Sequence, residues 1–145
     1  MKPLLPSQKM KTLITFLLLC ASPALARLGE TREQCEARYG KAVAGQSDPP
    51  ASMHEKAGLF IICKYDSAEG GKCRGIVFNR TDPVSRKKDP LMKVEIEILL
   101  KASSEGGEWV KDSIFSSTDE DIWRREGAKA SYSHLTHDLV IIHKD

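Results

Sequence analysis

The first 26 residues constrain this chain most, because they have the pattern of a secretory signal peptide. Lys9 and Lys11 supply a basic start, residues 13–19 form a short apolar segment, and Ala24-Leu25-Ala26 has the small-x-small form of a cleavage site. The apolar segment is shorter than the roughly 20 residues that a membrane-spanning helix needs. We therefore expect an exported protein, periplasmic or secreted, in which residues 27–145 form a single domain without a membrane anchor.

Cleavage also changes the charge of the chain. The leader holds three lysines and no acidic residue, so its removal changes the formal net charge from +2 to −1. This near balance of charges argues against a nucleic-acid-binding protein. The 119 residues that remain can bury a core of their own. Folding should therefore require no metal, and no cofactor is predicted.

Three cysteines remain after cleavage, namely Cys35, Cys63 and Cys73. Exported proteins meet an oxidising environment, so one disulfide and one free thiol are the simplest expectation. Cys63 and Cys73 belong to two predicted strands that can pair as a hairpin with both cysteines on one face. That arrangement permits a Cys63–Cys73 disulfide but does not require it. Cys35 is the competing partner, because the first predicted helix can pack on the same face.

The remaining patterns predict an α+β fold. Thr31 and Gln34 form a capping box that begins a helix over 31–39, residues 44–57 read as a loop, and residues 91–102 favour a second helix. Strands are predicted at 59–65, 73–78, 128–133 and 139–143. In the hairpin, the apolar pattern pairs Phe60 with Phe78, and an N-cap is predicted at Asp89-Pro90. Together these elements predict an antiparallel sheet of about four to five strands with two helices packed on one face.

No group of residues forms a recognisable catalytic or metal-binding motif. His134 and His137 fall in a predicted turn, so we interpret them as solvated, and Asp119-Glu120-Asp121 is interpreted as a solvated acidic run. A thiol-dependent or hydrolytic activity would have to use Cys35 or His137. The large amphipathic residues are the best candidates for contact with a partner: Trp109, Trp123 and Tyr132.

The chain resembles two groups of small exported α+β domains. A short helix that opens with Gly29-Glu30-Thr31 and closes with Arg38-Tyr39-Gly40, followed by a hairpin and a helix, is similar to β-lactamase-inhibitor-like domains and to small outer-membrane-assembly lipoproteins. In those groups a proline usually follows the glycine, whereas here Lys41-Ala42 follow it, and Leu19 before Cys20 does not fit a lipidation motif. The resemblance implies a helix-on-sheet domain used for protein contacts. The chain is also similar to small exported bacterial proteins without an assigned activity.

These observations predict a non-catalytic exported module that binds a protein or an envelope component. The alternative is a small secreted enzyme, either a hydrolase or a thiol-dependent one. The sequence does not indicate the partner or the oligomeric state.

Overall fold

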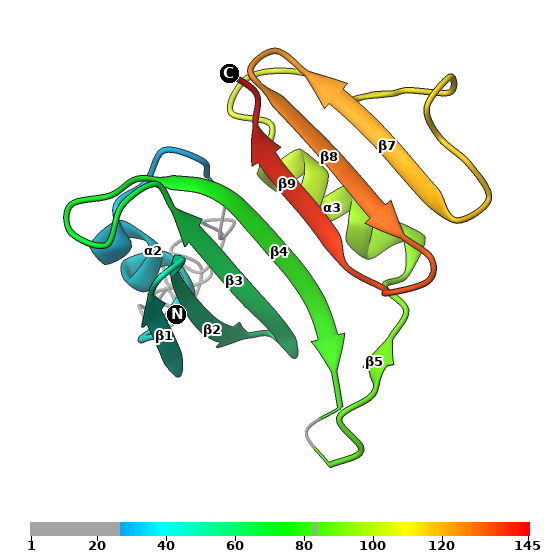
Figure 1. Ribbon diagram of the computed structural model, residues 1–145. Helices are drawn as coiled ribbons and strands as arrows, with labels where there is room; N and C mark the ends of the chain where they lie inside the picture. Colours follow the sequence, from blue (N-terminus) through cyan, green and yellow to red (C-terminus); the bar gives the residue numbers. More distant parts are fainter. Residues whose placement is uncertain (1–26, 83) are drawn as a thin grey trace, which may run out of the picture.

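The computed structural model describes residues 27–82 and 84–145. The predicted signal peptide and its cleavage site lie outside these residues. Two helices and nine strands are described within them (Figure 1), with the following bounds: α2 Arg32–Tyr39, β1 Ala44–Ser47, β2 Pro50–Lys56, β3 Leu59–Tyr65, β4 Cys73–Thr81, β5 Lys88–Asp89, α3 Lys93–Ala102, β6 Val110–Lys111, β7 Glu120–Arg125, β8 Ala128–Ser133 and β9 Leu139–His143.

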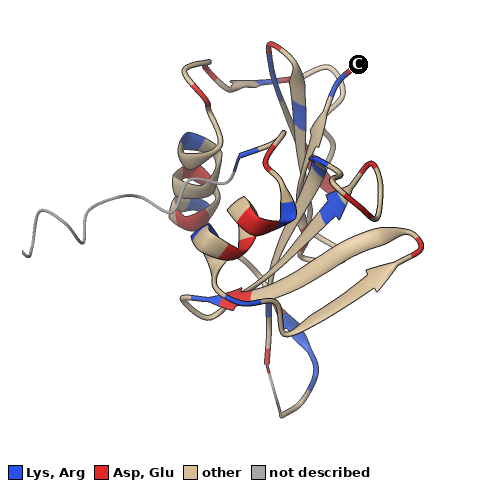
Figure 2. Ribbon diagram, turned by 90° about the vertical axis from the view of Figure 1, so that its left-hand side faces the viewer, with Lys and Arg blue, Asp and Glu red and all other residues tan. Residues whose placement is uncertain are grey.

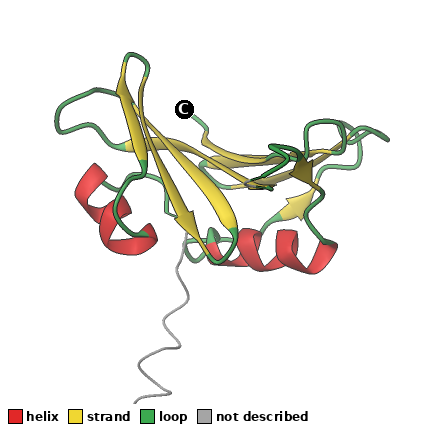
Figure 3. Cartoon of the chain, turned by 90° about the horizontal axis from the view of Figure 1, so that it is seen from below, coloured by secondary structure: helices red, strands yellow, loops and turns green. Residues whose placement is uncertain are grey.

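All the strands belong to one antiparallel sheet with the order β1-β2-β3-β4-β9-β8-β7-β6, and β5 pairs with β4. Strands β1 to β4 follow one another as neighbours, and so do β6 to β9. The pairing of β4 with β9 joins these two halves into one sheet. The sheet is bent, with α2 beside the β1–β4 half and α3 along the other half (Figure 3).

The predicted sheet of about four to five strands with two helices packed on one face is therefore wrong. Nine strands form one sheet, and both described helices are short. The largest omission is the segment 44–57, predicted as a loop, which forms β1 and β2. Its two buried strand positions, Ser52 and His54, are polar, so the segment shows no apolar alternation that would indicate a strand. Strands β5 and β6 have two residues each, which is too short for any pattern.

Both helices lie within the ranges predicted for them, and one of the two predicted N-caps is confirmed. The capping box of Thr31 and Gln34 is present at the start of α2. The predicted N-cap of α3 at Asp89-Pro90 is wrong, because Met92 is the N-cap and Asp89 pairs with β4. The backbone N–H of Met92 donates to the carboxylate of Glu95 at 2.7 Å, which satisfies one of the free donors at the helix start.

The predicted hairpin is confirmed as β3 and β4, but its register differs by one residue. Phe60 lies opposite Asn79 instead of Phe78, and Phe78 lies opposite Ile61. A bulge between Lys64 and Tyr65 then shifts the pairing at the far end of the hairpin. The register difference and the bulge together keep the inward-facing residues of both strands on the same face of the sheet.

The core lies between the central strands and α3, on the face of the sheet that α3 covers. Ile76 and Phe78 of β4 pack beside Leu139 and Ile141 of β9, and none of these four side chains is more than 1% exposed.

Both helices carry acidic and basic residues side by side (Figure 2). No helix among the described residues is long and apolar enough to cross a membrane.

Candidate functional site

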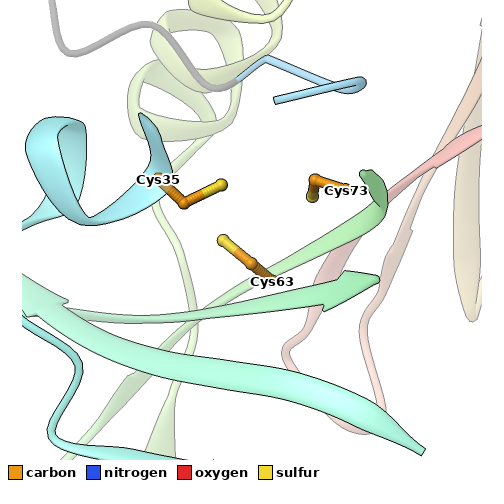
Figure 4. Close-up of side chains that lie close together, drawn as sticks. All are labelled: Cys35, Cys63 and Cys73. Carbon is orange, nitrogen blue, oxygen red and sulfur yellow. The ribbon is translucent and has the colours of Figure 1, made fainter. Parts of the chain in front are cut away.

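Three buried thiols come together between α2 and the β3–β4 hairpin (Figure 4). Cys35 belongs to α2, Cys63 to β3, and Cys73 is the first residue of β4. Each of these residues is 0% exposed, and their Sγ atoms all lie within 4.8 Å of one another. All three thiols are free. The predicted disulfide pair and its predicted competitor therefore share one site, which we call the thiol cluster.

The segment before α2 holds the helix beside the first residue of β4. The backbone N–H of Gly29 donates to the carbonyl oxygen of Cys73 at 2.7 Å, and the N–H of Cys73 donates to that of Glu30 at 2.8 Å. Because residues four apart share a face of a helix, Cys35 and Tyr39 both point into the core. Cys35 consequently reaches the two cysteines of the hairpin.

A chain of buried polar groups borders the thiol cluster. Nδ1 of His54 lies 2.7 Å from the carbonyl oxygen of Gly40, which can only accept, so Nδ1 carries a proton. In the neutral ring, Nε2 then accepts from the hydroxyl of Ser52 at 2.8 Å. The hydroxyl of Tyr65 lies 2.7 Å from Ser52 Oγ and completes the chain as a donor. Ser52 and His54 are not among the predicted site residues, because they belong to the segment 44–57, which was predicted as a loop.

The pKa values of the three thiols are shifted in different directions. The neighbouring thiols of Cys63 and Cys73 are the main cause of a lowered pKa at Cys35, although the thiol of Cys73 donates its own hydrogen bond to the carbonyl oxygen of Gly75 at 3.3 Å. The contact with Cys35, together with burial, raises the pKa of Cys63 and of Cys73. Burial opposes ionisation of all three thiols, because a charged thiolate loses its hydration there.

The thiol cluster supports two kinds of chemistry. Two of its sulfurs would have to move into bonding distance to form a disulfide, whereas three thiolates can ligate a soft metal ion. Within residues 27–82 and 84–145, no histidine or carboxylate joins the three sulfurs within the same 4.8 Å. Nucleophilic catalysis by Cys35 gains no support, because a side chain without exposed surface cannot meet a substrate in this conformation.

A second candidate site is a cleft between α3 and strands β6–β8, with a volume of about 620 Å³, which we call the α3 cleft. This volume falls within the range of ligand-binding pockets, about 300–1,000 Å³. Its floor is apolar and its rim carries charges of both signs. The lining includes Leu91, Lys93, Ile96, Glu97, Leu100, Lys111, Asp121, Trp123, Tyr132, His134 and His137.

The α3 cleft collects three of the residues predicted as candidates for partner contact or catalysis, namely Trp123, Tyr132 and His137. Tyr132 is 2% exposed and its hydroxyl accepts the N–H of Leu91 at 3.0 Å, so it forms part of the floor. Trp109 lies outside the lining. Its ring packs under the guanidinium of Arg125, with 5.1 Å between the guanidinium carbon and the ring centroid.

Asp121 organises the charged rim of the α3 cleft. Its carboxylate lies 2.6 Å from Nζ of Lys111 and 2.8 Å from Nε2 of His134. Nζ of Lys111 also lies 6.0 Å from the ring centroid of Trp123. Asp121 and His134 were predicted to be solvated groups, because nothing in the one-dimensional pattern shows that β7 and β8 bring them together.

The pKa of Asp121 is lowered, first by the hydrogen bond from Lys111 and then by that from His134. A lowered folded-state pKa stabilises the protein above the unfolded value of about 3.9 and loses this effect as pH falls through the folded value. We expect Asp121→Asn to reduce the free energy of unfolding at pH 7, and the difference from the wild type to shrink below about pH 4. Urea denaturation at pH 7, 4 and 2.5 measures this difference.

Lys111→Ala is the matched variant for this test, because it removes the larger cause of the shift and leaves the carboxylate in place. It should weaken the dependence of stability on pH in the same window. A difference between Asp121→Asn and the wild type that stays constant from pH 7 to pH 2.5 would contradict the prediction.

No family model matches the chain, and neither a curated protein nor a solved structure matches it. The resemblance to β-lactamase-inhibitor-like domains and to outer-membrane-assembly lipoproteins therefore stays a prediction. The functional assignment rests on the thiol cluster and the α3 cleft.

Proposed function

We propose that this chain is an exported, non-catalytic module that binds a protein or another envelope component in the α3 cleft. The observation that carries the proposal is the make-up of that cleft. An apolar floor with an aromatic ring at its side and charged groups at its rim is the arrangement of specific binding sites. Trp123 is partly exposed there and packs against the core, so it offers a large rigid contact surface.

The lining indicates the chemistry of the occupant. The apolar floor suits one large apolar side chain, which would lie against Ile96 and Trp123. At the rim, Lys93 and Glu97 carry opposite charges and are both exposed. A peptide segment with one apolar residue flanked by charged residues therefore fits the α3 cleft better than a wholly apolar molecule.

The alternative, a small secreted enzyme that uses Cys35 or His137, has weaker support. His137 lies in the α3 cleft, whereas Cys35 lies in the buried thiol cluster, so the two residues belong to different sites. In the α3 cleft, Asp121 and His134 form a hydrogen-bonded pair, but Asp121 is also held by Lys111, as in a structural ion pair. These contacts favour a binding surface over a catalytic set.

The proposal is tested by capture of a partner from the envelope and secreted fractions of the native source. We expect Trp123→Ala to weaken binding of the purified partner at least tenfold, because aromatic residues in such a position often contribute about 2 kcal/mol or more. The charge reversal Glu97→Lys on the exposed rim should also weaken binding. Titration calorimetry with the purified partner gives both dissociation constants.

Lys129→Glu is the matched control, because Lys129 lies on the other face of β8 from the buried residues Ala130 and Tyr132. It should leave the affinity within about twofold of the wild type, and thermal unfolding should show that each variant is folded. Equal affinities for the wild type, Trp123→Ala and Glu97→Lys would place the binding surface elsewhere and overturn the assignment to the α3 cleft. Failure to capture any partner would overturn the binding function itself.

A further inference from the structure

We propose that Cys35, Cys63 and Cys73 form a three-coordinate site for one soft monovalent metal ion, Cu(I). This inference is independent of the α3 cleft. It rests on three thiols from three different elements that point toward one another in a space closed to solvent (Figure 4).

The spacing of the sulfurs suits a trigonal centre. Metal–sulfur bonds of about 2.3 Å place the three ligands of a planar trigonal ion about 4 Å apart. The Sγ atoms already lie within 4.8 Å of one another, so a small inward movement of side chains completes the coordination. Soft thiolate ligands favour Cu(I), zinc and iron–sulfur clusters over the other first-row metals.

The number of ligands distinguishes Cu(I) from zinc. Structural zinc sites are almost always tetrahedral with four protein ligands. Within the described residues the thiol cluster offers three, and its burial leaves little room for water as a fourth. His54 is not a substitute, because Nδ1 is engaged with Gly40 and Nε2 with Ser52.

Binding exchanges protons for the ion. Three Cu–S bonds form, three S–H bonds break, and the protons pass to solvent, so the oxidation states of sulfur and copper do not change. One monovalent ion and three thiolates leave a net negative centre. Each thiol must lose its proton before its sulfur binds the ion. Affinity for the ion should therefore increase with pH.

A Cys63–Cys73 disulfide, or one with Cys35, is the competing outcome in an oxidising compartment. It would use two of the sulfurs and leave the third without a role. The two outcomes are distinguished by the thiol content of the exported protein. Alkylation under non-reducing, denaturing conditions followed by mass spectrometry counts the free thiols and identifies any bonded pair.

The direct experiment titrates the full exported protein with Cu(I) in the absence of oxygen, against a chromogenic Cu(I) chelator. We expect one ion per chain, and X-ray absorption should show three sulfur neighbours. Each of Cys35→Ala, Cys63→Ala and Cys73→Ala should lower the affinity at least tenfold. Zn(II) should bind at least tenfold more weakly than Cu(I).

Ser103→Ala is the matched control, because Ser103 is a buried residue at the end of α3 that bonds to Leu99 and belongs to neither candidate site. It should bind Cu(I) like the wild type. X-ray absorption on the wild type keeps the test decisive if an alanine variant fails to fold. A native disulfide among the three cysteines would overturn the proposal, as would two sulfur neighbours, unchanged affinity after loss of one cysteine, or zinc binding as tight as that of Cu(I).

Discussion

Replacing Phe78 by alanine is expected to lower the free energy of unfolding by about 3–5 kcal/mol, the usual cost of a large cavity in a core. Phe78 is 1% exposed and lies in β4, between Ile61 of β3 and Leu139 of β9. Its side chain therefore fills the core at the strand that joins the two halves of the sheet. Urea denaturation at constant pH, followed by circular dichroism, measures the loss.

Phe115→Ala is the matched control for Phe78→Ala. Phe115 is 63% exposed, and its ring contacts the guanidinium of Arg124, with 5.3 Å between the ring centroid and the guanidinium carbon. An exposed contact of this kind contributes up to about 1 kcal/mol. Equal losses for the two variants would contradict the assignment of Phe78 to the core.

The joint between β4 and β9 also predicts how the protein unfolds. Ile76 lies opposite Ile141 and Phe78 opposite Leu139, and all four belong to one core cluster, so the two halves share one continuous core. Phe78→Ala should therefore shift a single cooperative transition instead of producing two. Two separate transitions would show that β1–β4 and β6–β9 fold as independent units.

Local patterns predicted the elements that carry their own signals. The capping box of Thr31 and Gln34 begins α2 where expected, and the β-branched run of β9 is the strand predicted at 139–143. The two-residue strands β5 and β6 have no such signal, because pairing with a neighbouring strand is the only thing that defines them. The number of strands in the sheet could not be obtained without those pairings.

The candidate sites show the same division between local and long-range information. The shared face of Cys63 and Cys73 was predicted from a register that is wrong by one residue, and the bulge at Lys64–Tyr65 restores it, whereas the position of Cys35 depends on how α2 packs. The rim of the α3 cleft combines Lys111 and Asp121 with His134, and only strand pairing brings them together. Periodicity within one segment does not contain that information.

The second prediction of large effect concerns the hydrogen-bonded side chains of His54, Ser52 and Tyr65 beside the thiol cluster. These hydrogen bonds explain why β2 has polar residues at its buried positions. His54→Ala is expected to lower the free energy of unfolding by about 3 kcal/mol. The imidazole is 0% exposed, so its removal opens a cavity and leaves the hydroxyl of Ser52 without its acceptor. Urea denaturation at pH 7 measures the loss, and His143→Ala, at an exposed position in β9, should change stability by less than about 0.5 kcal/mol.

A double-mutant cycle determines whether the polar chain acts as a unit. Ser52 lies 2.8 Å from Nε2 of His54 and 2.7 Å from the hydroxyl of Tyr65, so Ser52→Ala alone breaks both links. The double variant Ser52→Ala/His54→Ala should then lose less stability than the two single losses added together, by about 0.5 kcal/mol or more. Strict additivity would show that the two residues contribute separately. In that case β2 would be held by its backbone pairing with β1 and β3, and the buried polar residues would not be a connected network that stabilises the wall of the thiol cluster.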